Sequence, residues 1–444
     1  MTNPPAFDPD SFSWLLGIED TCVYPADGGA PLDEHELTGH TARWRADLTA
    51  ARDTGATAVR YGMSWPLVHT APGTFDWVSL DEIVDFAVDE LGLDLVADLV
   101  HYGTPTWLTG SFADTGYPAA IEEFAGALAA RYRGRICAYT PLNEPVTTAS
   151  FCGLRGVWPP RLSGWYGWTT VVLPLAEGIV RATRAIRSAD PDAVIVHVEA
   201  ATWVHTTDEA LTEHTALLRR IGWLPTDLIL GAVDSNHPMY DWLLENGAAV
   251  DQLESLLRQS AAPDLIGVNY YPDLTPRRLV TVDGAPVQVA YNAGPAGLRS
   301  VLADFSNRYR LPLAVTETSI EGDDAARSAW LRESAAAVLD LRERGADIRG
   351  YTWWPLMDFV DWSYAAGGAN VEEFAVALAR DDDVAVGPAP PLGSPGDGKT
   401  PFLRRMGLLR LEEQADGSLD RVATPAVDAF RQVAMTMNSL AVTR

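Results

Sequence analysis

Eight short apolar segments, each separated from the next by a longer stretch, constrain the fold more than any other feature of this sequence. The apolar segments cover residues 14–18, 58–62, 93–100, 136–142, 193–199, 265–271, 312–317 and 349–354. Helical periodicity marks residues 40–55, 79–92, 121–134, 175–190 and 327–345 between them. Continuous apolar runs are typical of parallel strands that are buried on both faces. Eight such strands with helical connections predict an α/β fold, the (β/α)8 TIM barrel.

The main alternative fold is a doubly wound parallel sheet. That fold usually has fewer strands and carries a Gly-rich phosphate-binding turn after the first of them. The residues in that place, GIEDTCVYP at 17–25, do not form such a turn. We therefore expect one barrel domain over residues 1–444.

Two stretches exceed the length of an ordinary barrel connection. Residues 200–262 join the fifth and sixth expected strands and are long enough for two or three helices. Residues 365–400 follow the eighth strand and are rich in Gly, Pro and Asp. Loops of that length are usually functional or disordered, and we expect this one to be an insertion near the mouth of the active site.

The composition bounds the partners. A net charge of −27 argues against nucleic acid or an anionic membrane surface, since both are negative. The N-terminal residues do not resemble a secretory signal, and no run of 18 apolar residues occurs, so we expect a cytoplasmic protein. Three scattered cysteines do not suggest a disulfide framework or a metal site. Homo-oligomerisation stays open.

Polar or aromatic side chains stand at the C-terminal end of every expected strand, which is where barrels of this kind build their active sites. Core packing does not require such a pattern. The residues are Glu19, Arg60, His101, Asn143, Glu144, Glu199, Asn269, Tyr271, Glu317, Trp354 and Asp361.

Two of these residues, Glu144 and Glu317, suit glycoside hydrolysis if the barrel brings them together. That chemistry needs one carboxyl group as acid and a second that stays ionised. Arg60 and Tyr271 could stabilise an ionised Glu317, because a cation and a hydrogen-bond donor both favour the charged form. Metal-ligand spacings such as H-x-H or H-E-x-x-H and the serine motif G-x-S-x-G do not occur. We expect no metal and no cofactor.

The motifs around these residues resemble those of glycoside hydrolase family 1, the retaining β-glycosidases of the (β/α)8 clan A, of which this chain would be a divergent member. YTPLNEP (139–145) resembles the family's T-x-N-E-P, and AVTETS (314–319) keeps T-E of its I-T-E-N-G. Further similarities lie in the right order along nearly the whole chain. They are VRYGMSWPLV (59–68), LVHYGTPTWL (99–108), DLIGVNYY (264–271), GYTWWPLMDFVDW (350–362) and RMGLLRLE (405–412).

The resemblance implies roles for individual residues. Glu144 would be the acid/base and Glu317 the nucleophile, with Arg60 and Tyr271 in contact with the nucleophile. The implied substrate-binding residues are His101, Tyr102, Asn143, Asn269, Tyr271, Trp354, Asp361 and Trp362, together with Glu19 and Asp20.

Departures from the family pattern concern the sugar. The first strand lacks the family's sugar-binding Gln, so Glu19 or Asp20 is expected to replace it. Asp361 stands in place of a Glu, and Tyr102 in place of a Trp. No Lys occurs between residues 362 and 398, which disfavours a 6-phosphosugar.

The resulting hypothesis is a retaining β-glycosidase acting on a small-molecule glycoside or oligosaccharide. Its two carboxyl groups should lie about 5–5.5 Å apart. A transglycosylase using the same covalent intermediate is the first alternative, favoured by an apolar acceptor side built from Trp158, Trp165 and Trp168. A sugar-binding barrel without catalysis is the second.

Overall fold

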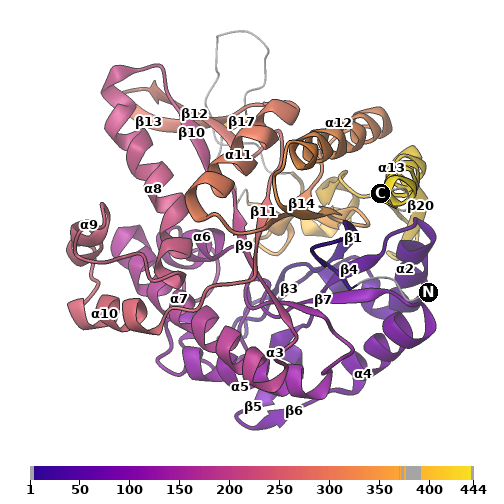
Figure 1. Ribbon diagram of the computed structural model, residues 1–444, viewed down its shortest axis with the longest axis horizontal. Helices are drawn as coiled ribbons and strands as arrows, with labels where there is room; N and C mark the ends of the chain where they lie inside the picture. Colours follow the sequence, from indigo (N-terminus) through magenta and orange to yellow (C-terminus); the bar gives the residue numbers. More distant parts are fainter. Residues whose placement is uncertain (1–4, 370, 372–374, 377–391, 442–444) are drawn as a thin grey trace.

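The computed structural model describes residues 5–369, 371, 375–376 and 392–441. Eight parallel strands form a closed barrel in which each strand pairs with the next along the chain and the last pairs with the first (Figure 1). They are β1 (Ser13–Ile18), β4 (Ala58–Gly62), β7 (Asp94–Asp98), β8 (Ala138–Thr140), β9 (Val194–Ala200), β11 (Leu265–Asn269), β14 (Leu313–Thr318) and β15 (Ile348–Trp353). The predicted (β/α)8 barrel is therefore confirmed, with every strand in its expected segment.

The helices lie outside the barrel (Figure 1). Those in the predicted segments are α2 (His40–Asp53), α4 (Val78–Val84) with its π-helical continuation (Asp85–Glu90), α5 (Tyr117–Arg131), α7 (Gly164–Ala189) and α12 (Asp324–Glu343). Helix α7 begins at Gly164, well before the predicted residue 175, and so includes the Trp-rich residues 164–168. Helices α11 (Gly294–Tyr309) and α13 (Pro425–Ala441) complete the long helices of the outer layer, and no described helix is long and apolar enough to cross a membrane.

The connection between β9 and β11 contains three helices, as expected. They are α8 (Thr212–Ile229), α9 (Tyr240–Glu245) and α10 (Val250–Gln259), preceded by β10 (Trp203–His205). After β11 the chain forms a hairpin of β12 (Pro276–Val282) and β13 (Ala285–Ala290), which was not predicted from the sequence. A four-stranded sheet in the order β10-β12-β13-β17 results, with β17 at Ala375–Val376. Most of residues 370–391, the middle part of the predicted inserted loop 365–400, lies outside the described residues.

The shorter elements lie in the connections between the barrel strands and in the C-terminal segment. They are β2 (Cys22–Val23), β3 (Leu32–Asp33), α1 (Glu34–Leu37), α3 (Trp65–Val68), β5 (His69–Ala71), β6 (Thr74–Phe75), α6 (Pro145–Ala149), β16 (Phe359–Val360), β18 (Leu403–Arg404), β19 (Leu409–Glu413) and β20 (Leu419–Ala423).

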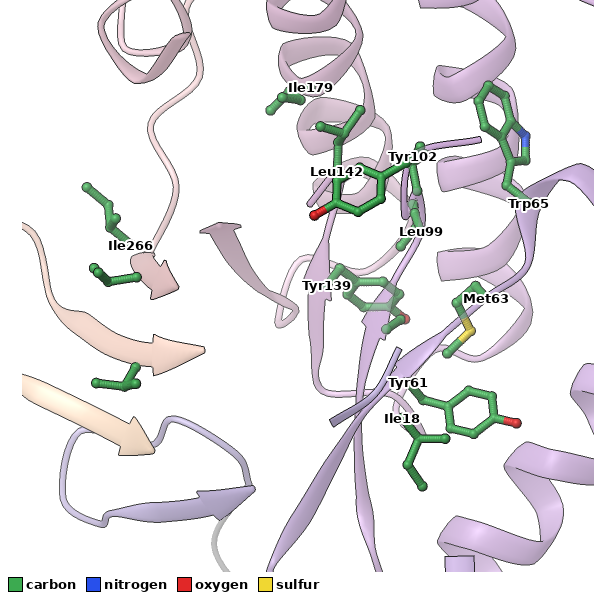
Figure 2. Packing of buried hydrophobic residues seen from close by; sticks show 14 of the residues in the cluster. Ile18, Tyr61, Met63, Trp65, Leu99, Tyr102, Tyr139, Leu142, Ile179 and Ile266 are labelled. Carbon is green, nitrogen blue, oxygen red and sulfur yellow. The ribbon is translucent and has the colours of Figure 1, made fainter. Parts of the chain in front are cut away.

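The apolar core has two main parts, one between the barrel and its helices and one inside the barrel. Part of the outer cluster, including Tyr61, Leu99 and Ile266, is shown in Figure 2. The inner cluster consists of smaller side chains such as Ala58, Val96 and Ala314, and Phe7 closes it at the N-terminal end. A Cβ added to Gly350 would lie 2.7 Å from the Phe7 ring. The ring therefore packs against the glycine backbone, where no side chain would fit, and plugs this end of the barrel.

The inner face of the barrel changes from apolar to polar along each strand. Because alternate residues of a strand point to the same face, the position two residues after Ala58 is Arg60, and the position two residues after Val96 is Asp98. Both side chains are buried. The barrel interior is therefore an apolar base with a polar layer at the C-terminal ends of its strands.

Candidate active site

Glu317 lies near the end of β14, where the strand pairing is irregular on both sides. Val268 of β11 pairs with Val315, but the next residue, Asn269, pairs with Glu317, so Thr316 is an extra residue on β14. Such bulges re-aim side chains next to active sites. The Tyr271 hydroxyl donates a hydrogen bond of 2.8 Å to Glu317 Oε2.

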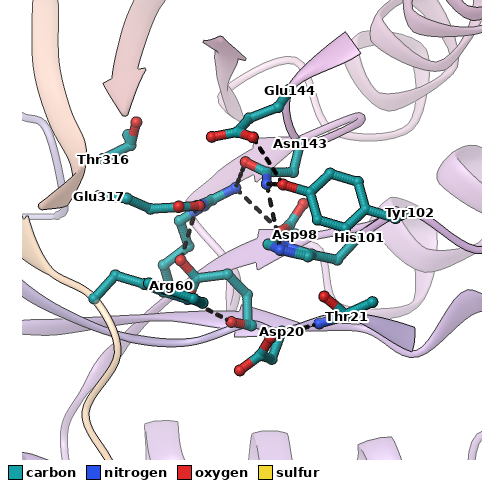
Figure 3. A network of polar contacts seen from close by, with 12 residues as sticks. Asp20, Thr21, Arg60, Asp98, His101, Tyr102, Asn143, Glu144, Thr316 and Glu317 are labelled. Atoms are coloured by element: carbon teal, nitrogen blue, oxygen red, sulfur yellow. Dashed lines mark hydrogen bonds and ion pairs between the residues drawn. The ribbon is translucent and has the colours of Figure 1, made fainter. Parts of the chain in front are cut away.

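Arg60 lies at the centre of the polar layer (Figure 3). Its Nη1 donates to Glu317 Oε1 at 2.7 Å and to Glu19 Oε1 at 2.8 Å. Its Nη2 donates to Asn143 Oδ1 at 2.8 Å and to Asp98 Oδ2 at 3.0 Å. Burial disfavours the guanidinium charge, but the neighbouring carboxylates outweigh it and raise the pKa of Arg60. One fixed cation thus orients the predicted nucleophile.

Glu144 lies four residues after the end of β8, directly before α6, and has left-handed backbone angles, φ 48° and ψ 71°. Its Oε1 accepts a hydrogen bond of 2.7 Å from Asn269 Nδ2, and its Oε2 accepts one of 2.8 Å from the Tyr102 hydroxyl. Thr316 Oγ1 donates to Asn269 Oδ1 at 2.7 Å, which turns the amide NH2 toward Glu144. The positively charged Arg60 therefore contacts Glu317, whereas Tyr102 and Asn269, which donate to Glu144, are neutral.

Glu199, at the end of β9, supports the turn that carries Glu144. Its Oε1 accepts from the backbone N–H groups of Val146 (3.3 Å) and Ala200 (2.9 Å). Burial, followed by the charge of Glu144, raises the pKa of Glu199 well above its ordinary value. Glu199 therefore caps the backbone N–H groups on either side of the site.

The pKa of Glu317 is raised to about 6. Burial is the main cause and the charge of Glu144 the second, while Arg60, His101 and Tyr271 act in the opposite direction. Since the guanidinium of Arg60 contacts Glu317, a negative charge is best stabilised on that carboxyl group.

Asp98 belongs to this network, although it was not predicted as a site residue from the sequence. Its Oδ2 accepts from Arg60 and also lies 2.7 Å from His101 Nδ1, and the Asn143 amide nitrogen lies 3.3 Å from His101 Nε2. Burial opposes protonation of the ring, but the hydrogen bond to Asp98 and its charge raise the pKa of His101. The signal for Asp98 was its inward position on β7, two residues after Val96.

A cavity of about 530 Å³, including solvent at its open end, is lined by Glu144 and Glu317. Six of the predicted substrate-binding residues line it: His101, Tyr102, Tyr271, Trp354, Asp361 and Trp362. Leu274, Phe359, Arg404 and Met406 also line it and were not predicted. The two predicted catalytic residues therefore share one cavity with most of the predicted sugar contacts.

The other predicted sites lie behind or beside this cavity. Asn143 is fully buried, and its Nδ2 donates to the Tyr102 hydroxyl at 2.9 Å. Asn269 lines a neighbouring cavity. Glu19 is fully buried against Arg60, and burial raises its pKa well above the ordinary value. Asp20 does not line the cavity and keeps part of its surface exposed. The loss of water around its carboxyl group raises its pKa to about 7.

Trp354 occupies the space next to β1 that a side chain on Gly17 would need. A Cβ on Gly17 would lie 2.4 Å from Trp354 Cδ1, and the Trp354 indole N–H donates to the Glu19 carbonyl at 2.8 Å. The glycine is required here by this close approach. The ring therefore packs directly on the backbone of β1. Glu19 and Asp20, which were expected to reach the sugar, are not among the residues that line the cavity.

Asp361 forms an ion pair with Arg404 at the opposite side of the cavity, with 2.8 Å between Oδ2 and Nη1. Its Oδ1 accepts from the Ser363 N–H at 2.9 Å. The guanidinium of Arg404 lies over the Phe359 ring, 5.9 Å from its centroid. An ion pair and an aromatic ring thus form the wall in which Asp361 was predicted.

The three tryptophans predicted for the acceptor side divide into two groups. Trp158 is buried behind the site and stacks on Tyr102 (5.0 Å) and Phe151 (4.4 Å). Trp165 and Trp168 line a second cavity that also borders Glu144.

Comparisons with known proteins relate the chain to glycoside hydrolases. Residues 28–226 match the family model described as cellulase (glycosyl hydrolase family 5). The bifunctional β-D-glucosidase/β-D-fucosidase of Bifidobacterium breve is 26% identical over 74% of this chain and 83% of its own length. The β-glucosidase of Agrobacterium sp. is 24% identical over 73% of this chain and 77% of its own length.

Solved structures agree with the fold. A β-glucosidase from Thermotoga maritima in complex with castanospermine superposes with a TM-score of 0.76 at 17% identity, covering 98% of this chain and 99% of the other. At that identity the likeness establishes the barrel fold. The family model and the curated relatives support a glycoside hydrolase, a β-glycosidase of the (β/α)8 clan.

Proposed function

We propose that this protein is a divergent glycoside hydrolase family 1 enzyme that hydrolyses β-glycosides with retention of configuration. The observation that carries the proposal is the asymmetric environment of the two carboxyl groups. Arg60 and Tyr271 both donate to Glu317, which favours the anion required of a nucleophile. Glu144 faces the same cavity from the opposite side of the barrel mouth, in contact with Tyr102 and Asn269.

The reaction has two displacements. Glu317 attacks the anomeric carbon while Glu144 gives its proton to the departing glycosidic oxygen, so the C–O bond breaks and a glycosyl ester forms on Glu317. Glu144 then takes a proton from water, which attacks the ester and frees both the sugar and Glu317. This mechanism requires carboxyl groups about 5–5.5 Å apart, compared with about 6.5–9.5 Å for inversion.

The glycone contacts in this proposal come from the cavity lining. His101 and Tyr102 lie on the Glu144 side, Trp354 provides the aromatic platform, and the Asp361–Arg404 pair faces the far side of the ring. Arg60, Glu19 and Asn143 orient the catalytic groups from behind. The names of the relatives support β-D-glucosides and β-D-fucosides as the first substrates to test.

The test uses 4-nitrophenyl β-D-glycosides and two alanine variants with added azide. Glu144→Ala should retain turnover of a substrate with a good leaving group, and azide should trap its glycosyl ester as the β-glycosyl azide. Glu317→Ala should be inactive without azide and should yield the α-glycosyl azide with it. The opposite pairing of products would reverse the two assignments, and an inverted sugar product from the wild type would exclude retention.

Transfer to an alcohol instead of water stays the alternative, since it uses the same intermediate. The apolar residues of the second cavity beside Glu144 favour binding of such an acceptor. Product analysis with and without an added alcohol distinguishes transfer from hydrolysis.

A further inference from the structure

A groove on the outer layer of the barrel lies between β10, α8 and α11, which are close to one another in Figure 1. It encloses about 770 Å³, including solvent at its open side. Two tryptophans and five polar residues line it, and the cavity around Glu317 has an entirely different lining. The groove is therefore a separate place on the molecule, with no part in the reaction proposed above.

The walls of the groove are fixed by close packing of the three elements. Helix α8 approaches β10 at Gly222, where a Cβ would lie 2.4 Å from the Thr202 side chain. On its other side, the Trp223 ring of α8 packs edge-on against Phe305 of α11, with 4.7 Å between the ring centroids. The groove therefore needs no ligand to form.

The aromatic surface of the groove comes from Trp203 on β10 and Trp223 on α8, both of which are partly exposed. The face of an aromatic ring carries negative partial charge. It attracts the C–H groups on the faces of a β-linked glucose unit, whose hydroxyl groups all project from the edge of the sugar ring. The two indoles therefore suit the flat faces of such a sugar.

Polar side chains beside the rings are available for sugar hydroxyl groups. Asp304 and Asn307 are exposed and three residues apart on α11, so they are neighbours on one face of the helix. Within the described part of the chain, neither side chain has a hydrogen-bond partner. Arg219 donates from Nε to the Val204 carbonyl at 2.6 Å. Carboxylate, amide and guanidinium groups each present paired acceptors or donors, which match adjacent hydroxyl groups.

The charges around the groove balance one another. Arg308 forms an ion pair of 2.5 Å with Asp227, and Arg219 shares the lining with Asp304. A balanced site attracts neither an anion nor a cation strongly, so it favours a neutral ligand. A neutral sugar fits both this balance and the mixture of aromatic and polar groups.

We propose that this groove is a second, non-catalytic carbohydrate site that binds a chain of β-linked glucose units. Its volume of about 770 Å³ exceeds the 530 Å³ of the catalytic cavity, which favours more than one sugar ring. Thr202 lines both the groove and the cavity beside Glu144, so a chain bound here is held near the catalytic residues. The proposal concerns binding and is independent of the proposed reaction.

Native gels that contain a soluble polysaccharide test the proposal with the intact protein. Hydroxyethylcellulose, a soluble β-linked glucan, should slow the migration of the wild type in a concentration-dependent manner. Dextran, an α-linked glucan, should have little effect. Unchanged migration in hydroxyethylcellulose, or equal retardation by dextran, would overturn the proposal.

Three variants locate the binding. Trp203→Ala should weaken the retardation by about tenfold or more, because it removes one aromatic face. The double variant Asp304→Ala/Asn307→Ala should weaken it by about fivefold, since two hydrogen-bonding groups are lost. Arg299→Ala is the control, because Arg299 lies on α11 outside the groove and pairs with Asp340. It should migrate like the wild type.

The turnover of 4-nitrophenyl β-D-glucoside separates the two proposals. All three variants should keep kcat/KM within about twofold of the wild type, because none of the changed residues lines the catalytic cavity. Absence of turnover in every protein would contradict the proposed function and leave the groove untouched. Retardation that persists in both groove variants would place the binding elsewhere and overturn the groove. If Trp203→Ala does not fold, the exposed double variant still decides.

Discussion

Replacement of Tyr271 by phenylalanine should shift the acid limb of the pH–rate profile. The variant removes the hydroxyl that donates a hydrogen bond of 2.8 Å to Glu317 Oε2. It keeps the ring that packs against Trp354. This hydrogen bond lowers the pKa of Glu317, which burial and Glu144 raise to about 6. Its loss therefore moves that pKa further upward, and a higher pH is needed to ionise the nucleophile.

The size of the shift follows from the strength of the lost bond. A hydrogen bond to a charged group contributes about 1.5–3 kcal/mol, and one pKa unit corresponds to about 1.4 kcal/mol, so the expected shift is about one to two units. Water that enters the cavity would replace part of the interaction, which favours the lower value of about one unit. The acid limb of kcat/KM should then move from near 6 to about 7.

The assay is kcat/KM for an aryl β-glycoside between pH 4.5 and 9, with Tyr270→Phe as the control. Tyr270 is adjacent in the chain, but its hydroxyl donates to the Gly294 carbonyl at 3.1 Å, away from the carboxyl pair. The control should keep the wild-type limb. An unshifted limb in Tyr271→Phe, or an equal shift in Tyr270→Phe, would refute the reasoning.

Three further substitutions test other parts of the structure. Glu19→Gln should leave the acid limb within about 0.3 pH units, since burial raises the pKa of Glu19 and favours its neutral form; a shift of a full unit in the same profiles would show that Glu19 is ionised. Phe7→Ala should lower the free energy of unfolding by about 3–5 kcal/mol in urea titrations because it removes the buried plug of the barrel, whereas the exposed Met435→Ala should change it by less than about 0.5 kcal/mol. Glu199→Leu should cost about 1–3 kcal/mol in the same measurement because it leaves two backbone N–H groups unpaired, and no loss would contradict its role as a cap.

The barrel could be predicted because each of its strands is a continuous apolar run. The β12–β13 hairpin was missed although the sequence carries its signal, Asp283–Gly284 between two alternating segments. Both residues have positive φ angles, 48° and 80°, as a type I′ turn requires. Helix α11 was also not predicted, although Pro295 in its first turn is a sequence signal for the start of a helix.

The site was predictable where its residues follow the strand ends, and less so elsewhere. Glu144, Glu317 and Arg60 lie at strand ends and meet through barrel closure alone. Arg404 and Met406 reach the cavity from a segment after residue 392, whose path depends on the tertiary structure. The close packing of Trp354 on Gly17 joins residues far apart in the chain, and no local pattern in the sequence expresses it.

The left-handed backbone at Glu144 implies a conflict between folding and catalysis. A non-glycine residue pays about 1 kcal/mol or more for such angles, and here the side chain is also a buried acid beside two other carboxyl groups. Selection for stability alone would favour glycine at this position. A screen for higher stability should therefore find Glu144→Gly among the stabilising substitutions. Because that substitution removes the proposed acid/base, engineering for heat resistance must keep Glu144 fixed.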